Sequence, residues 1–380
     1  MYKKGLIFIG SLLLLTVVLS AQNSKTAADF YNEGMQLKSE EKYKEAAAVF
    51  AKAIQKKPDY KDALYEIGWC LNEVEEYKLS ITHLQNAARL SPAETKVLFE
   101  LGYAFEKNKD KQNATKYFKK VLALSPTYYS AYMHMGDIYY DAEQYDTALN
   151  NYEQYFKTDT ITNSYYYKAG WCANDISKYN DAINYLTKYD PAEAEDKVKK
   201  FTETGFAHYK LEQNEQAITA YKKALEIDSD YLLAIKGLGD VYYNNTQDYK
   251  AALELFERVM ERDEANSKLY YYKLGWLYND VERYNDAAKM LVKAIAFDSK
   301  DASYREELGY TYYMLGSYDD AFRHLKKAVE LNPKSTMGYY YQGLCYIALS
   351  KTTDAKSIYE KLKRIDAEQA EKLLKKINAN

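Results

Sequence analysis

Apolar and polar positions alternate along the chain in a pattern that repeats about every 34 residues. Ten glycines mark the period, with spacings of 34 to 36 residues: Gly34, Gly68, Gly102, Gly136, Gly170, Gly205, Gly239, Gly275, Gly309 and Gly343. A small residue follows each glycine by 12 or 13 positions, and a large apolar residue follows four positions later, as with Ala46 and Phe50 in the first repeat. Residues four positions apart lie on the same face of a helix, so these spacings indicate helices with one apolar face. Each repeat is therefore predicted to be a hairpin of two amphipathic helices.

Proline indicates where the second helix of a repeat ends. Proline cannot continue a helix, and it recurs at the same position of four repeats, as Pro58, Pro92, Pro126 and Pro333. The fifth repeat carries a shifted Asp190-Pro191, and the seventh repeat has an extra residue near Asn245. The chain holds only 15 Gly and 5 Pro, which predicts few turns and long helices.

Taken together, these residues resemble the tetratricopeptide repeat (TPR). The resemblance covers residues 27–363 as ten repeats, and it implies an all-α, right-handed superhelical solenoid. Beyond them, residues 364–380 keep one apolar face, made of Ala367, Ala370, Leu373, Leu374 and Ile377. This segment is predicted to be the capping helix that a solenoid needs.

The N-terminus has the pattern of a secretory signal peptide. Lys3 and Lys4 precede an apolar run from Leu6 to Leu19, which is shorter than the roughly 20 residues of a membrane span. We predict a cleaved signal peptide over residues 1–21, with the cut after Ala21, and a short leader over 22–26. The mature chain would then have no transmembrane span and be exported to the periplasm. Secretion into the medium and an uncleaved membrane anchor are the alternatives.

The charge balance limits the possible partners, and the cysteine positions predict the state of the thiols. The 52 basic and 55 acidic side chains leave a net charge of -3 and no basic field, so nucleic acid is not expected as a partner. Cys70, Cys172 and Cys345 lie far apart in the chain but at one position of their repeats. They are predicted to be buried, unpaired thiols.

Besides the period of about 34 residues, the sequence has a longer period of three repeats. The second, fifth and eighth repeats share Tyr-x-x-Gly-Trp-x-x-Asn followed by an acid, and they contain all three tryptophans of the chain. The third, sixth and ninth share a Glu two residues before the glycine, at Glu100, Glu203 and Glu307. The chain is thus predicted to be a three-repeat block used three times and closed by a tenth repeat.

The resemblance implies that the Tyr, Trp and Asn of this signature line the concave groove of the solenoid. A helical wheel separates their face from the seam with the second helix. The candidate ligand-binding residues are Tyr65, Trp69, Asn72, Glu73, Tyr103, Tyr140, Tyr167, Trp171, Asn174, Asp175, Phe206, Tyr243, Tyr272, Trp276, Asn279, Asp280 and Tyr310. Packing between helices is the alternative role for such an aromatic stripe.

These residue types suit an extended polypeptide, because Trp and Tyr offer rigid contact area and Asn can pair with a peptide backbone. We expect a protein–protein interaction scaffold that binds one or more proteins or extended peptides. Glycan binding by the same aromatic groove, or an accessory role beside a separate envelope enzyme, are the alternatives. The sequence carries no phosphate loop, nucleophile elbow or paired metal ligands, so we expect no catalytic residues, no metal and no cofactor.

Overall fold

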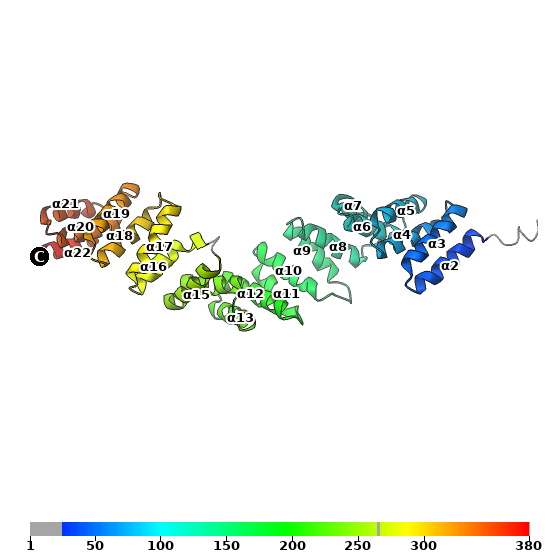
Figure 1. The fold of residues 1–380 in the computed structure, drawn as a ribbon, viewed down its shortest axis with the longest axis horizontal. Helices are drawn as coiled ribbons and strands as arrows, with labels where there is room; N and C mark the ends of the chain where they lie inside the picture. Colours follow the sequence, from blue (N-terminus) through cyan, green and yellow to red (C-terminus); the bar gives the residue numbers. More distant parts are fainter. Residues whose placement is uncertain (1–24, 264–266, 380) are drawn as a thin grey trace, which may run out of the picture. The chain divides into compact units, whose positions relative to one another are not determined.

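The computed structural model describes residues 25–263 and 267–379 (Figure 1). This part of the chain forms 21 α-helices and contains no β-strand, which confirms the all-α prediction. The predicted signal peptide and the first residues of the leader lie outside the described residues.

The helices alternate between first and second members of the predicted repeats. Their bounds in chain order are α2 (Ala27–Ser39), α3 (Tyr43–Lys56), α4 (Lys61–Glu73), α5 (Tyr77–Leu90), α6 (Thr95–Lys107), α7 (Lys111–Leu124), α8 (Tyr129–Tyr140), α9 (Tyr145–Tyr155), α10 (Ser164–Asp175), α11 (Tyr179–Lys188), α12 (Ala194–Lys210), α13 (Asn214–Ile227), α14 (Leu232–Val241), α15 (Tyr249–Arg262), α16 (Tyr271–Asp280), α17 (Tyr284–Phe297), α18 (Ala302–Met314), α19 (Tyr318–Leu331), α20 (Thr336–Ala348), α21 (Thr352–Lys363) and α22 (Ala367–Asn378).

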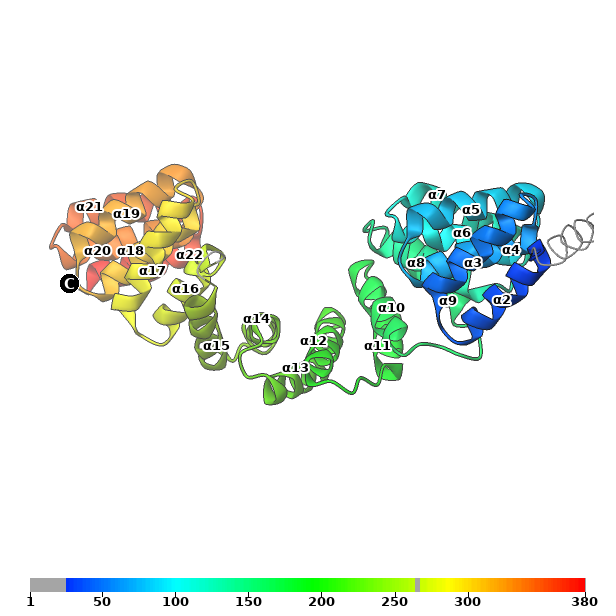
Figure 2. The same cartoon turned by 45° about the vertical axis from the view of Figure 1, so that its right-hand side comes forward.

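The chain divides into two compact units, one ending at Ser177 and the other beginning at Lys178. The first unit ends with α10, so the division falls inside the fifth predicted repeat. Within each unit every helix packs against the next (Figures 1 and 2). First helices of neighbouring repeats are also in contact, for example α4 with α6 and α18 with α20. Stacked hairpins of this kind form a TPR-type solenoid.

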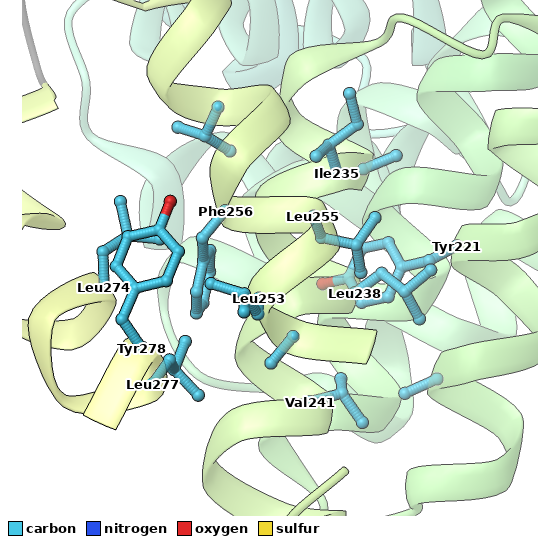
Figure 3. Close-up of a cluster of buried hydrophobic side chains, with 14 of the residues drawn as sticks. Tyr221, Ile235, Leu238, Val241, Leu253, Leu255, Phe256, Leu274, Leu277 and Tyr278 are labelled. Carbon is cyan, nitrogen blue, oxygen red and sulfur yellow. The ribbon is translucent and has the colours of Figure 1, made fainter. Parts of the chain in front are cut away.

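In eight of the repeats the hairpin closes where a large side chain lies directly on a glycine. A methyl group added to Gly34, Gly68, Gly102, Gly136, Gly205, Gly239, Gly275 or Gly309 would lie 2.4 to 2.9 Å from the large apolar residue predicted to face it. The small residue between them, such as Ala46 or Ala321, is fully buried. Figure 3 shows two of these large side chains, Tyr221 and Phe256, within the core of the second unit.

The tenth repeat departs from this arrangement. The atoms nearest to a methyl group on Gly343 belong to Leu373 of α22, at 2.5 Å, rather than to Tyr359 as the pattern predicts. The reason is that α22 packs against both α20 and α21 and fills the space over the last glycine.

The four repeated prolines stand where the pattern places them. Each directly follows the C-cap residue of a second helix, as Pro58 follows Lys57 after α3 and Pro333 follows Asn332 after α19. The extra residue of the seventh repeat is absorbed by a short π-helix, Tyr242–Thr246, at the end of α14. A π-helical turn accommodates one added residue without changing the register of the helices around it.

The expectation of few turns and long helices is wrong, since the helices have only 10 to 17 residues. The turns between first and second helices are made mostly without glycine. Their left-handed residue has a φ of 57° to 75°, and only Gly316 is a glycine among Glu41, Glu75, Lys109, Glu143, Ser177, Glu212, Gln247, Glu282, Gly316 and Ser350.

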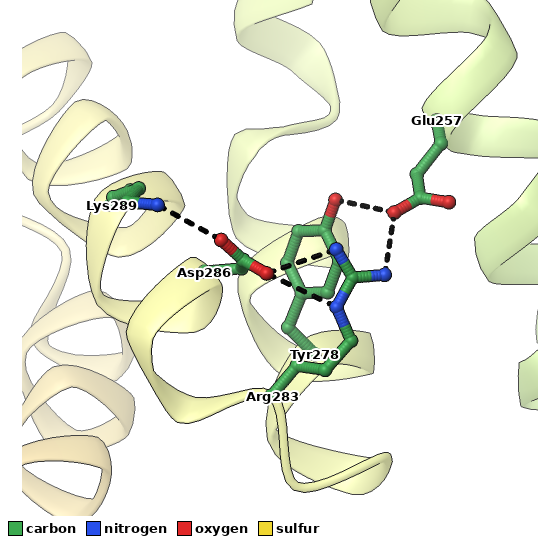
Figure 4. Close-up of polar contacts among 5 residues, drawn as sticks. All are labelled: Glu257, Tyr278, Arg283, Asp286 and Lys289. Carbon is green, nitrogen blue, oxygen red and sulfur yellow. Dashed lines mark hydrogen bonds and ion pairs between the residues drawn. The ribbon is translucent and has the colours of Figure 1, made fainter. Parts of the chain in front are cut away.

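Polar contacts add to the packing at the junction of α15 with the α16–α17 hairpin (Figure 4). Tyr278 and Arg283 both donate to Oε1 of Glu257 at 2.8 Å. Arg283 also donates to Asp286, which accepts from Lys289 at 3.0 Å. The three cysteines are free and fully buried, as predicted, and burial raises the pKa of each thiol to about 12.

The left-handed turns predict stability changes of opposite sign at two equivalent positions. Gly316→Ala is expected to lower the free energy of unfolding by about 1 kcal/mol, because a Cβ there meets no atom within 4 Å and only backbone strain acts. Glu282→Gly, at the same turn position one repeat earlier, is expected to raise it by roughly 0.5 kcal/mol. Urea unfolding of both variants measures the two effects, and equal signs would contradict this account.

Candidate functional site

The tryptophans of the signature each lie edge-on to a tyrosine of the preceding repeat. That tyrosine is the first residue of the preceding second helix. The ring centroids are 5.4 Å apart for Tyr43 and Trp69, 4.7 Å for Tyr145 and Trp171, and 4.8 Å for Tyr249 and Trp276, with interplanar angles of 74° to 81°. Such edge-to-face pairs are favourable. All three tryptophans are half-buried, so part of each indole remains accessible.

The same contact recurs one repeat further along the chain. Tyr77 lies edge-on to Tyr103, Tyr179 to Phe206, and Tyr284 to Tyr310, at centroid distances of 6.2 to 6.5 Å. Tyr140 and Tyr243 lie beside Trp171 and Trp276 at 5.5 and 6.0 Å. In the first block, Lys38 occupies the position equivalent to Tyr140 and Tyr243, and its ammonium lies 3.8 Å from the ring centroid of Trp69.

The signature asparagines are buried, and two of them donate to a glutamate of the next repeat. Nδ2 of Asn72 donates to Oε2 of Glu100 at 2.9 Å, and Nδ2 of Asn279 donates to Oε2 of Glu307 at 3.0 Å. Asn72, Asn174 and Asn279 are only 3%, 4% and 6% exposed. In the first and third blocks, a buried Asn of one repeat therefore pairs with a half-buried Glu of the next.

The two pairs differ in how the asparagine oxygen is satisfied. Thr311 donates to Oδ1 of Asn279 at 3.0 Å, whereas Ala104 occupies the equivalent position in the first block. Oδ1 of Asn72 accordingly has no hydrogen-bond partner among the described residues.

The remaining predicted residues divide into packed and exposed groups. Tyr65, Tyr167 and Tyr272 are half-buried; Tyr65 lies under the ammonium of Lys96 at 4.6 Å, and Tyr272 packs on Tyr304 at 4.8 Å. Burial raises the pKa of Tyr272 to about 12. The acids that end the signature, Glu73, Asp175 and Asp280, are exposed.

Four of the predicted residues line one cavity of about 270 Å³ in the second unit, which we call the junction pocket. Its lining is Trp276, Asn279, Asp280, Glu307, Tyr310, Met337 and Tyr341. The residues come from α16, α18 and α20, the first helices of three successive repeats. The candidate list omits Glu307, Met337 and Tyr341; only Glu307 had a signal in the sequence, as the shared Glu before the glycine.

The electrostatics of the junction pocket are acidic. Burial raises the pKa of Glu307, while the hydrogen bond from Asn279 opposes the rise and the nearby Glu306 adds to it. Burial also raises the pKa of Tyr341 to about 12 and raises that of Tyr310. The described residues contain no group of three or more side chains that could hold a metal ion.

Models of known protein families match several parts of the chain. Models described as tetratricopeptide repeats match residues 31–92, 95–128 and 129–160, and one described as a TPR repeat matches 205–245. The chain belongs to the tetratricopeptide repeat family. A model of anaphase-promoting complex (cyclosome) subunit 3 also matches this TPR protein, over residues 280–362.

Curated relatives share only short segments with this TPR protein. Tetratricopeptide repeat protein 37 of Xenopus laevis is 39% identical over 90 residues, which are 22% of this chain and 6% of that protein. The uncharacterised protein ycf37 of Porphyra purpurea is 29% identical over 76 residues, 20% of this chain and 43% of that protein. The chain thus matches less than half the length of either relative.

Solved structures show similar repeats. YrrB, described as a TPR protein with an unusual peptide-binding site, is 19% identical, with a TM-score of 0.45 over 50% of this chain and 97% of its own. MamA is 23% identical, with a TM-score of 0.40 over 47% of this chain and 96% of its own.

TPR proteins are generally non-catalytic protein–protein interaction scaffolds, and the repeats of this chain support that level of function. Within residues 25–263 and 267–379, no helix combines the length and apolar character needed to cross a bilayer.

The buried Asn–Glu pair predicts a pH-dependent stability. The pKa of Glu307 in the folded protein lies above its ordinary value of 4.5, so the folded state holds the proton more tightly than the unfolded state. Relative to Glu307→Gln, which cannot ionise, the wild-type protein is therefore expected to lose stability as the pH rises from 4.5 through the folded pKa. Urea unfolding of both proteins at several pH values measures the difference.

The exposed Glu226 of α13 provides the control, since Glu226→Gln removes a carboxylate that is not buried. A difference between wild type and Glu307→Gln that is constant with pH, or that grows in favour of the wild type as the pH rises, would contradict the account.

Proposed function

We propose that this TPR protein is a non-catalytic scaffold that binds an extended polypeptide along the concave face formed by the signature aromatic residues. The observation that carries the proposal is the junction pocket. Trp276, Asn279, Asp280 and Tyr310, which the three-repeat period singles out, line one cavity there although they come from two repeats.

The contacts within the solenoid assign different roles to the signature residues. Asn72 and Asn279 donate to glutamates of the next repeat, so they join neighbouring first helices and orient a carboxylate. The half-buried tryptophans and tyrosines and the exposed acids remain for the partner. Rigid aromatic side chains with a polar edge suit recognition of a polypeptide, because little conformational entropy is lost when they bind.

We also propose that the protein acts outside the cytoplasm, most simply in the periplasm, after removal of residues 1–21. Sequencing the N-terminus of protein extracted from cells that express the full chain tests this, and Gln22 is the expected first residue. A mature protein that starts at Met1 would show that the apolar run is retained.

Groove binding is tested by capture of partners from an envelope extract on residues 22–380, beside the variant Trp69→Ala/Trp171→Ala/Trp276→Ala. Each indole has at least one edge-on partner and is half-buried, so we expect a loss of about 1–2 kcal/mol per site. We expect the variant to stay folded and to lose the captured partner. The melting temperature of the same preparations checks folding.

Phe297→Ala provides the matched control, because Phe297 is an exposed aromatic residue at the end of a second helix. A folded triple variant that retains its partner would place the interaction elsewhere on the solenoid. Treating the extract with protease separates polypeptide from glycan: captured material that survives the protease would favour the glycan alternative over this proposal.

A further inference from the structure

We propose that the junction pocket binds a basic side chain, lysine or arginine, that the partner polypeptide presents. The inference rests on the proposed function and specifies which residue of the partner this site selects.

The pocket has the walls that a cation requires. Trp276, Tyr310 and Tyr341 supply three aromatic rings, and the rings of Tyr310 and Tyr341 lie 5.1 Å apart at 68° to one another. Met337 adds a flexible apolar side chain that suits a methylene stem. Aromatic rings attract a cation through their electron-rich faces, most strongly where water is excluded.

The described part of the chain supplies no counterion for the negative charge of the pocket. Neither Asp280 nor Glu307 forms an ion pair within residues 25–263 and 267–379. The groups that shift the pKa of Glu307 are its own burial, Asn279 and the acid Glu306, with no basic side chain among them. A half-buried carboxylate without a counterion is costly, and a bound ammonium or guanidinium group would offset that cost.

The equivalent position in the first block is different. There burial raises the pKa of Glu100, the hydrogen bond from Asn72 lowers it and the nearby Glu73 raises it further. Lys38 and His134 also lower this pKa, so basic groups of the chain itself offset part of the charge of Glu100. His134 of the fourth repeat stands where the tenth repeat has Tyr341, and Ser130 stands where it has Met337. The junction pocket therefore combines an aromatic wall with uncompensated charge, and the equivalent place after the first block does not.

The chain itself contains an example of the proposed contact. The ammonium of Lys38 lies 3.8 Å from the ring centroid of Trp69 and 2.6 Å from Oε2 of Glu66. A signature tryptophan and a carboxylate thus already hold one lysine between them. In the junction pocket the same groups are present, and the lysine must come from another molecule.

The test uses the full chain and pools of short fluorescent peptides of neutral composition that differ only in the central residue: Lys, Arg, Nε-acetyl-lysine or Glu. We expect fluorescence anisotropy to show about tenfold tighter binding of the Lys or Arg pool than of the acetyl-lysine pool, and weakest binding of the Glu pool. Acetylation keeps the stem and removes the charge, so this comparison isolates the cation.

The variant Asp280→Asn/Glu307→Gln is expected to bind the Lys and acetyl-lysine pools equally. The glutamine that replaces Glu307 would keep an oxygen for Asn279, and the melting temperature checks that the fold persists. The control Glu226→Gln/Glu360→Gln removes two exposed acids of second helices and is expected to keep the preference for lysine.

The outcomes separate this inference from the proposed function. If all pools bind the wild type equally, and binding is lost in the tryptophan triple variant, the groove binds polypeptide but the cation site is wrong. A preference for lysine that survives in Asp280→Asn/Glu307→Gln also overturns the inference. Failure of every peptide pool to bind the wild type also overturns the inference. If the wild type in addition captures no partner from the extract, the proposed function is wrong as well.

Discussion

The close approach of two helices at a glycine is the contact on which the rest of this protein depends. In eight of the repeats a large side chain lies where any Cβ on the glycine would be, so the second helix can reach its place only because the first helix is bare there. The orientation of the hairpin follows from this contact. It also determines which face of the first helix is turned away from its partner and toward the neighbouring repeats.

Because the face away from the hairpin seam also meets the next repeat, its residues serve two purposes. The tyrosine that begins one second helix lies edge-on to the aromatic residue after the next glycine, and the signature asparagine donates to the next glutamate. Within each unit, these contacts join first helices into a continuous row. A surface for partners can then arise only from atoms that the row leaves uncovered, which explains why tryptophans are half-buried and asparagines are not exposed.

Periodicity in the sequence was sufficient to predict the hairpins, the glycine contacts and the proline positions, since each depends on spacing within one repeat. It failed at Gly343, where the covering residue Leu373 comes from a helix outside the period. It failed again for turn content, because Glu and Ser adopt the left-handed conformation that composition assigns to glycine. For the candidate site, the helical wheel grouped Trp276 and Asn279 on one face, and both line the junction pocket. It could not show that Asn279 meets Glu307, since that contact joins two repeats.

The contacts between repeats also bear on how such a chain can be rearranged. Lys38 of the first repeat meets Glu66 of the second at 2.6 Å, whereas Asp240 of the seventh meets Lys273 of the eighth at 2.8 Å. Exchanging the second and eighth repeats would set Lys273 against Lys38. Moving a signature asparagine away from its glutamate would leave a half-buried carboxylate without its hydrogen-bond donor. The interchangeable cassette in this protein is accordingly larger than one hairpin, so recombination that preserves folding must respect the order of neighbours as well as the repeat length.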